Sequence, residues 1–448
     1  MRFLIIGGDA AGMSAASKAK RRMPELEVVV LERSRDVSYS ACGMPYNIAE
    51  PETGIEELVV RDADTFINKQ HIDLRLDHNV ESIDPGAKVV RGMEADQKPF
   101  TLTYDKLLIA TGASPVMPDI PGLDHNGVFP LKSLDHGRRI KQFIGTKDVQ
   151  RAVIIGMGYV GLEMCEALRA RGIEVAMVKP GTRFLPWMNP ELSRVISLTA
   201  TKNSVAMHAG QAINSIVTHK DSMRVRCDTV DLDADMVIVA SGVRPNSEFA
   251  MDAGLATGIS DSISVDDQLR TSDPDIYSAG DCADAFHLVT GERCWIPLAL
   301  RANRAGWAVA DNVCGVETRL DGVVGTAVFK FFDLEIARTG LTPREAEAAG
   351  FDPVEVVVEN SSKAHAQKGS TAIYTAMTGD KNTGRLLGVQ MVGQQGVAHR
   401  INAPAVALHN RMDVKGFFQT DFAYAPPFGP VWDPLLTAAN QLLKKLGA

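Results

Sequence analysis

The segment RFLIIGGDAAG, residues 2–12, is the strongest indicator of fold in this 448-residue chain. Its apolar beginning predicts a buried strand, its glycines predict a tight turn, and the small residues after them predict a helix. The glycines let the backbone approach a pyrophosphate, and the helix N-terminus directs free N–H groups at it. A second apolar run, residues 27–31, ends at Glu32, where a carboxylate can bind the ribose hydroxyls of an adenine nucleotide. The predicted binding residues of this first site are Gly7, Gly8, Ala10, Ala11, Gly12, Glu32 and Arg33.

A second glycine-rich turn, RAVIIGMGYVG at residues 151–161, contains the complete pattern G-x-G-x-x-G between a strand and a helix. Two such turns imply that the chain binds two dinucleotides. The strand at residues 174–178 ends at Lys179, where a protein that binds NADH usually has a carboxylate, and a cation there suits the 2′-phosphate of NADPH. We therefore expect NADPH, or both NADPH and NADH, at this second site. Its predicted binding residues are Gly156, Gly158, Val160, Gly161 and Lys179.

Three more apolar strands indicate how the two sites are connected. Residues 106–112 and 235–242 each end at a glycine turn, as expected where the chain crosses between nucleotide domains. Residues 275–281 form a strand that ends at a carboxylate, which in such a fold would reach the ribityl chain of a flavin. These turns add Ala110, Thr111, Gly112, Gly242, Gly280 and Asp281 to the predicted cofactor-binding residues.

Cys42, in the stretch SYSACGMPYN at residues 38–47, is the candidate redox residue, and it has no cysteine partner nearby. A cysteine at the N-terminal end of a helix has its thiolate stabilised by the helix dipole. We therefore expect the pKa of Cys42 to lie well below that of a free cysteine. A sulfur in contact with a reduced flavin could then receive two electrons from it.

The chain resembles the FAD-dependent pyridine nucleotide–disulfide oxidoreductases over essentially its whole length. Within this family it resembles the single-cysteine branch of coenzyme A disulfide reductases, NADH oxidases and persulfide reductases. The resemblance rests on both glycine-rich turns, the Cys42 stretch, Gly280-Asp281, and AYAPPF at residues 423–428. It implies FAD in the first site, NAD(P)H in the second, and a homodimer formed through the C-terminal domain.

The resemblance also implies roles for single residues. Cys42 would be the redox-active sulfur, and Tyr424 of the partner subunit would protonate the departing thiolate. Glu163 would contact the nicotinamide amide, and Tyr159 would cover the flavin ring until nicotinamide displaces it. Coenzyme A, as a substrate or in a mixed disulfide, would touch the protein through two further side chains. These two coenzyme A contacts are Arg22 and Asn303. Two more residues, Ser38 and Tyr39, are predicted to bind the substrate, and Ala299 is predicted to bind the cofactor.

The order of these motifs predicts an α/β fold with two Rossmann-like nucleotide-binding domains and a C-terminal α+β dimerisation domain. The strand that ends at Asp281 must return to the flavin site opened by Gly7, so the first domain is interrupted by the second. The predicted domains are an FAD-binding domain at residues 1–110 and 246–325, an NAD(P)H-binding domain at residues 111–245, and a dimerisation domain at residues 326–448.

The absence of a second cysteine beside Cys42 limits the chemistry. Two-cysteine disulfide reductases carry their second cysteine five residues on, where this chain has Asn47, so Cys42 must form a mixed disulfide, a persulfide or a sulfenic acid. Peroxidase and oxidase relatives carry a histidine where this chain has Ala10, which weakens the sulfenic acid route. A second tyrosine of the coenzyme A branch is missing after the segment AHA at residues 364–366, which leaves Tyr424 or His365 as the proton donor.

We therefore expect an NAD(P)H-dependent reductase of a low-molecular-weight disulfide, persulfide or polysulfide, with coenzyme A disulfide or coenzyme A persulfide as the leading substrate. An NAD(P)H oxidase that reduces O2 and a redox-gated flavoprotein binding module are the alternatives. The net charge of −8 argues against nucleic-acid binding, and no apolar stretch reaches the roughly 18 residues of a membrane span. None of the six cysteines forms a C-x-x-C pair, so no metal site is expected. Because no membrane span is expected, we predict a cytoplasmic protein.

Overall fold

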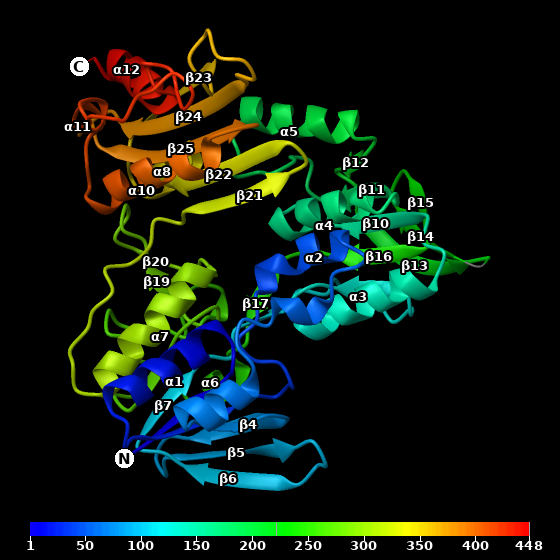
Figure 1. Ribbon diagram of the computed structural model, residues 1–448, viewed down its shortest axis with the longest axis vertical. Helices are drawn as coiled ribbons and strands as arrows, with labels where there is room; N and C mark the ends of the chain where they lie inside the picture. The colour runs from blue at the N-terminus through cyan, green and yellow to red at the C-terminus, as the bar shows by residue number, and fades with distance from the viewer. Residues whose placement is uncertain (221, 448) are drawn as a thin grey trace.

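The computed structural model describes residues 1–220 and 222–447, and Figure 1 shows three regions, each built on a five-stranded sheet. The first sheet is parallel, with strand order β18-β7-β1-β2-β3. Its apolar strands are buried on both faces, as parallel sheets require. Its strands are β1 (Arg2–Ile6), β2 (Glu27–Leu31), β3 (Asp73–Arg75), β7 (Lys106–Ile109) and β18 (Ile276–Ser278).

Helices α1 (Ala10–Arg22) and α7 (Ala299–Val313) cover one face of this sheet and lie side by side (Figure 1). Gly306 of α7 makes their close approach possible, because a Cβ atom there would lie 2.2 Å from the carbonyl oxygen of Ala11. The antiparallel strands β4 (His78–Asp84), β5 (Val89–Glu94) and β6 (Pro99–Thr103) and the short helix α6 (Glu248–Asp252) complete this region.

The second sheet is also parallel, with strand order β12-β11-β10-β16-β9. Its strands are β9 (Val128–Pro130), β10 (Arg151–Ile155), β11 (Glu174–Lys179), β12 (Ala206–Ala209) and β16 (Met236–Val239). The helices of this region are α3 (Leu134–Thr146), α4 (Tyr159–Ala170) and α5 (Pro190–Lys202). A separate antiparallel sheet consists of β13 (Ile213–His219), β14 (Ser222–Cys227) and β15 (Asp231–Ala234).

The third sheet is antiparallel, with strand order β21-β22-β25-β24-β23. Its strands are β21 (Ala327–Phe331), β22 (Leu334–Gly340), β23 (Pro353–Ser361), β24 (Ala372–Asp380) and β25 (Leu386–Gly393). The helices of this region are α8 (Pro343–Ala348), α9 (Val397–Arg400), α10 (Asn402–His409), α11 (Val414–Phe418) and α12 (Pro434–Leu446). The predicted α/β class with an α+β C-terminal region is confirmed.

A two-stranded ribbon connects the first two regions. Strand β8 (Ala113–Pro115) carries the chain out of the first region, and the antiparallel β17 (Val243–Pro245) brings it back. Asn246 fastens the crossing, since its carbonyl oxygen accepts a hydrogen bond from Thr111 Oγ1 at 2.6 Å and its Oδ1 accepts one from Ser114 Oγ at 2.6 Å. The ribbon lies where the sequence predicts the crossings, and the exact domain limits remain predictions.

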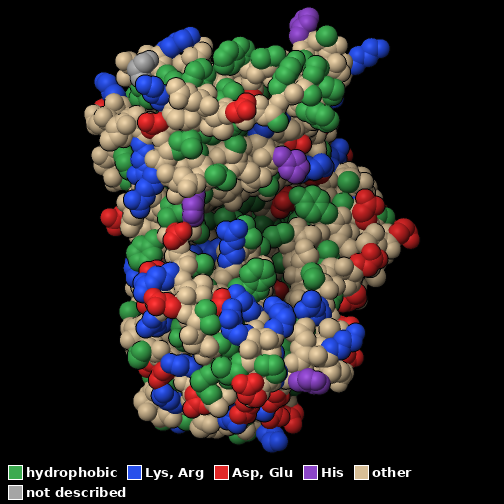
Figure 2. All heavy atoms as spheres, turned by 60° about the vertical axis from the view of Figure 1, so that its left-hand side comes forward, with side chains coloured by type: hydrophobic (Ala, Val, Ile, Leu, Met, Phe, Trp, Pro, Cys, Tyr) green, Lys and Arg blue, Asp and Glu red, His purple; other side chains and the backbone are tan. Residues whose placement is uncertain are grey.

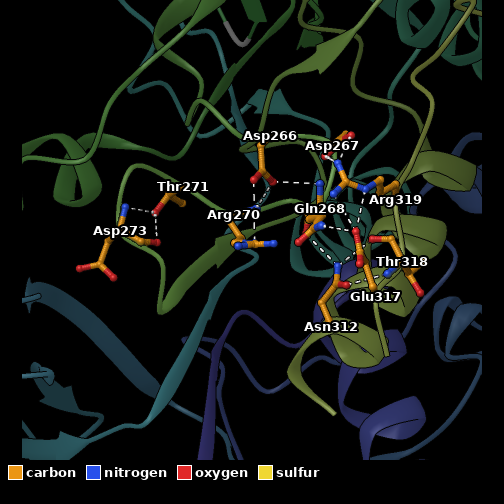
Figure 3. Close-up of polar contacts among 10 residues, drawn as sticks. All are labelled: Asp266, Asp267, Gln268, Arg270, Thr271, Asp273, Asn312, Glu317, Thr318 and Arg319. Atoms are coloured by element: carbon orange, nitrogen blue, oxygen red, sulfur yellow. Dashed lines mark hydrogen bonds and ion pairs between the residues drawn. The ribbon is translucent and has the colours of Figure 1, made fainter. Parts of the chain in front are cut away.

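A polar network holds the segment that leads back into the first sheet (Figure 3). Asp266 accepts the backbone N–H groups of Gln268 and Arg270, both at 2.9 Å. Asn312, near the end of α7, donates its side-chain amide to the carbonyl oxygen of Gln268 at 3.0 Å, and Arg319 pairs with Asp267 at 2.8 Å. These contacts fasten the segment to α7 and so fix the approach to β18, whose end carries Gly280 and Asp281.

The segment that contains Cys42 leaves the first region and packs on the second. Cys42 lies in the 3-10 turn η1 (Ala41–Gly43), and helix α2 (Met44–Ala49) comes directly after it and lies against α4 and α3 (Figure 1). Met44 and Ile48 are buried in the same core as Leu162 of α4. Within the described ranges, no helix is long and apolar enough to cross a membrane.

Candidate active site

One continuous cavity of about 2210 Å³ connects the two glycine-rich turns. Figure 2 shows the surface hollowed about midway along the molecule, between the region of the third sheet and that of the first. The cavity brings together residues far apart in the sequence, including Gly7, Cys42, Gly156 and Asp281. Two nucleotides and a sulfur atom therefore have access to the same space.

The first turn has the backbone of a pyrophosphate-binding loop. Gly7 has a φ of +108°, and a Cβ atom there would lie 2.2 Å from the carbonyl oxygen of Ala110, so only glycine fits. Within the described chain no side chain caps the start of α1, which leaves its first N–H groups available to a ligand. The Glu32 carboxylate is oriented by the backbone N–H of Gly8, which donates to it at 2.7 Å. These groups fit the adenosine and pyrophosphate parts of FAD.

The second turn repeats this geometry. Gly156 has a φ of +118°, and its added Cβ atom would lie 2.2 Å from the carbonyl oxygen of Ala240. At Gly158 and Gly242 an added Cβ atom would meet none of the described atoms within 4 Å, so both positions face open cavity where a dinucleotide fits. Lys179 ends β11 at the cavity wall, and its Nζ donates to the carbonyl oxygen of Arg183 at 2.9 Å.

Cys42 is exposed at the wall of this cavity. Burial of its sulfur raises the pKa of Cys42, and the carboxylate of Glu163 raises it further. Lys132 lowers this pKa, but Asp281 and Asp9 oppose it. The predicted low pKa is therefore wrong for the polypeptide, because partial burial and three carboxylates outweigh the single cation of Lys132.

Lys132 and Asp9 are site residues that the sequence interpretation missed. Lys132, just before α3, lines the cavity and pairs with Asp281 at 2.9 Å. Burial raises the pKa of Asp9 to about 6, although Lys132 acts in the opposite direction. No motif marks Lys132, and the only sequence signal at Asp9 is that it stands where the pattern G-x-G-x-x-G has its middle glycine.

Most of the predicted site residues line the cavity. Of the cofactor-binding set these are Gly7, Gly8, Ala10, Ala11, Glu32, Arg33, Ala110, Thr111, Gly112, Gly156, Gly158, Tyr159, Val160, Glu163, Lys179, Gly242, Gly280, Asp281 and Ala299. Those predicted for catalysis or substrate binding are Cys42, Ser38, Tyr39 and Asn303.

Four predicted residues lie outside this lining. Added Cβ atoms at Gly12 and Gly161 would lie 1.9 Å and 2.9 Å from the carbonyl oxygens of Gly7 and Gly156, so these glycines let each helix pack against its turn. Arg22 pairs with the buried Asp311 at 2.8 Å and is not directed at the cavity. Tyr424 is 50% exposed on the C-terminal region and does not line the cavity of its own subunit.

Two other predicted residues have partners that the sequence did not reveal. The Tyr159 ring packs against Phe329 and Trp187, with centroid distances of 5.0 Å and 5.4 Å, as part of an aromatic cluster at the cavity wall. Glu163 accepts a hydrogen bond at 2.9 Å from the phenol of Tyr46. Asn47 holds the loop, since its side-chain amide donates to the carbonyl oxygen of Gly54 at 2.9 Å.

The family comparison agrees with this architecture. Residues 1–306 match the model of the pyridine nucleotide-disulphide oxidoreductases, and residues 326–434 match that of their dimerisation domain. The chain is 38% identical over 444 residues to an NAD(P)H sulfur oxidoreductase (CoA-dependent) of Pyrococcus abyssi, covering 98% of this chain and 97% of that protein. It is 32% identical over 450 residues to an NADH oxidase of Methanocaldococcus jannaschii, covering 100% and 99%.

A solved structure gives the same result. An NAD-dependent persulfide reductase from A. fulgidus superposes with a TM-score of 0.96 at 33% identity, covering 100% of this chain and 84% of that one. The similarity extends over all three regions of the chain.

Proposed function

Because the chain belongs to the pyridine nucleotide-disulphide oxidoreductase family, we propose that it is a homodimeric FAD enzyme that uses NAD(P)H to reduce a small sulfur compound through Cys42. The substrate class is a low-molecular-weight disulfide, persulfide or polysulfide, with coenzyme A disulfide or coenzyme A persulfide first among them. The supporting observation is that Cys42 opens on the cavity shared by both glycine-rich turns. We place the enzyme in the cytoplasm, where NAD(P)H is supplied.

The residues of the first turn fit FAD, and those of the second fit NAD(P)H. The N–H groups at the start of α1 would hold the FAD pyrophosphate, Glu32 its ribose, and Asp281 its ribityl chain. When bound, FAD supplies the transfer of two electrons from NAD(P)H to sulfur. Lys179 would attract the 2′-phosphate of NADPH, so we propose that NADPH is accepted at least as well as NADH.

The chemical step falls to Cys42. Its thiolate attacks one sulfur of the substrate S–S bond; a new S–S bond to Cys42 forms, the substrate bond breaks, and the leaving sulfur departs with the electron pair. That departing thiolate takes a proton from Tyr424 of the partner subunit or from His365. Reduction of the mixed disulfide or persulfide by two electrons then returns the Cys42 thiolate and releases the second sulfur. Lys132 favours the thiolate at both stages.

Mass spectrometry of the purified, unreduced protein tests this proposal. We expect Cys42 to carry an added mass of coenzyme A or of one sulfur. An added mass of one oxygen would instead support the oxidase hypothesis. The oxidase is the second candidate because one similar protein is named NADH oxidase. Oxygen consumption without any sulfur substrate, unaffected by added disulfide or polysulfide, would decide for the oxidase.

A further inference from the structure

Tyr46 lies where three regions of the chain come together. It lies on α2, four residues after Cys42, and donates a hydrogen bond to Glu163 Oε1 of α4 at 2.9 Å. Lys330, on β21, lies close enough to the same phenol for its backbone to lower the pKa of Tyr46. The helix next to the cysteine, the helix of the second glycine-rich turn and the C-terminal sheet therefore meet at this side chain.

Glu163 is the carboxylate of α4 that faces the cavity. Glu166, one turn further on, is engaged elsewhere: it accepts the backbone N–H of Phe332 at 2.8 Å and pairs with Lys330 Nζ. Among the described residues, Tyr46 is the hydrogen-bond donor to Glu163. One oxygen of Glu163 is thus held by the phenol, and the carboxylate still lines the space into which a nicotinamide fits.

The groups around Glu163 have opposing effects on its charge. Burial raises the pKa of Glu163, the Tyr46 hydrogen bond lowers it, and Glu166 raises it. The thiol of Cys42 faces Glu163 from η1, and Lys330 acts on α4 through its pair with Glu166. Burial and Glu163 raise the pKa of Tyr46 well above its ordinary value, so the phenol stays a donor at any working pH.

We infer that Tyr46 is a positioning residue for the nicotinamide: its hydrogen bond orients Glu163, so that the carboxylate accepts an N–H of the nicotinamide amide. The inference rests on the proposed function because it takes the second turn as the NAD(P)H site. It adds a residue from the cysteine segment to the site of the electron donor. Removal of the Tyr46 hydroxyl from α2 should therefore weaken the binding of NAD(P)H at α4.

The test is anaerobic rapid-mixing measurement of flavin reduction by NAD(P)H in the holoenzyme, without any sulfur substrate, for Tyr46→Phe. A hydrogen bond to a charged group corresponds to about a tenfold effect, so the concentration of NAD(P)H at half-maximal rate should rise about tenfold. The acid limb of the pH profile for reduction at low NAD(P)H should move to higher pH, because loss of the hydrogen bond raises the pKa of Glu163. A purely structural role would not move that limb.

Two further variants separate the outcomes. Tyr104 is a matched control, because its buried hydroxyl has no hydrogen-bond partner among the described residues, and Tyr104→Phe should leave both readouts unchanged. Glu163→Gln should remove the acid limb and make Tyr46→Phe without effect in the double variant.

The inference is overturned if Tyr46→Phe keeps the wild-type NAD(P)H dependence and pH profile, or if its effect persists in the Glu163→Gln background. These readouts do not depend on the sulfur substrate. A holoenzyme that reduces its flavin with NAD(P)H but turns over no sulfur compound would contradict the proposed function and leave the role of Tyr46 standing.

Discussion

The two glycine-rich turns have the same backbone and different side chains. Gly7 and Gly156 both place an added Cβ atom 2.2 Å from the carbonyl oxygen at the end of the neighbouring strand. The third position of each turn differs, with a half-buried Asp9 in the first and Gly158 facing open cavity in the second. The ends of the second strands also differ, with Glu32 in one and Lys179 in the other. The shared backbone therefore builds a dinucleotide site, and these few side chains determine which nucleotide it suits.

The regions also differ in the path of the chain beyond the second strand. After β2 the chain leaves the first region, presents Cys42 to the cavity and packs α2 on α4. After β11 the chain passes through α5, which packs against β24 and β25 of the third sheet, and returns to its own sheet at β12. The reactive sulfur thus belongs to the first region by sequence but is held by the second, which explains why its electrostatics depend on both.

The largest expected effect comes from the loss of Cys42, the cysteine that the first region presents to the shared cavity. Cys42→Ser should lower turnover of coenzyme A disulfide and polysulfide by at least about a thousandfold, because the nucleophile is lost, while FAD stays bound. The measurement is steady-state turnover together with the flavin absorbance of the purified variant. Cys294, which lines the same cavity and whose pKa burial raises to about 11, is the matched control: Cys294→Ser should keep turnover. Turnover retained by Cys42→Ser would falsify the mechanism.

A pair of substitutions in the second turn separates its backbone role from its ligand role. Gly156→Ala should destabilise the protein by about 2–4 kcal/mol, because its Cβ atom collides with a carbonyl oxygen and its φ is positive. Gly158→Ala should leave the unfolding midpoint unchanged but raise the KM for NAD(P)H about tenfold, because its Cβ atom enters the nucleotide space. Thermal unfolding and steady-state kinetics with NAD(P)H measure the two effects. Equal loss of stability in both variants would show that Gly158 is also structural.

The contrast at the third position predicts a pH effect on stability. Burial raises the pKa of Asp9 from 3.8 to about 6, so folding favours its protonated form. Asp9 therefore does not lower the free energy of unfolding below pH 3.8. As the pH rises from 3.8 to about 6 this free energy falls, by about 3 kcal/mol at most, and it stays at the lower value above pH 6. Asp9→Asn should unfold at the same temperature as the wild type near pH 4 and at a higher temperature at pH 8. An equal difference at both pH values would contradict this assignment.

Local signals in the sequence were sufficient for the frame of the molecule. Glycine spacing and short apolar runs are read within about ten residues, and they led to both turns and to the strands that cross between the nucleotide domains. The strand predicted at residues 275–281 is found as β18 beside β7.

The electrostatics of the site could not be read in the same way. The pKa of Cys42 is set by carboxylates that folding brings from Asp9, Glu163 and Asp281. The hydrogen bond from Tyr46 to Glu163 joins residues 117 apart in the sequence. The ion pair of Arg22 forms only because folding places Asp311 of α7 beside it. Such pairings result from packing between regions, and no local pattern indicates them.

The smallest expected effect concerns the difference at the strand ends. Lys179→Asp should raise the KM for NADPH about tenfold, because a carboxylate there repels the 2′-phosphate, and should leave the KM for NADH unchanged or lower it. The carbonyl oxygen of Arg183, in the same loop, accepts a hydrogen bond from Lys179 Nζ. Lys179→Met removes the positive charge without adding a negative one, so it separates the loss of attraction from the gain of repulsion. Steady-state kinetics with both nucleotides at moderate ionic strength measure the ratio, which added salt should reduce. If the KM values for NADPH and NADH rise by the same factor in both variants, Lys179 only shapes the loop. The residue at the end of β11 then does not determine which nucleotide this chain prefers.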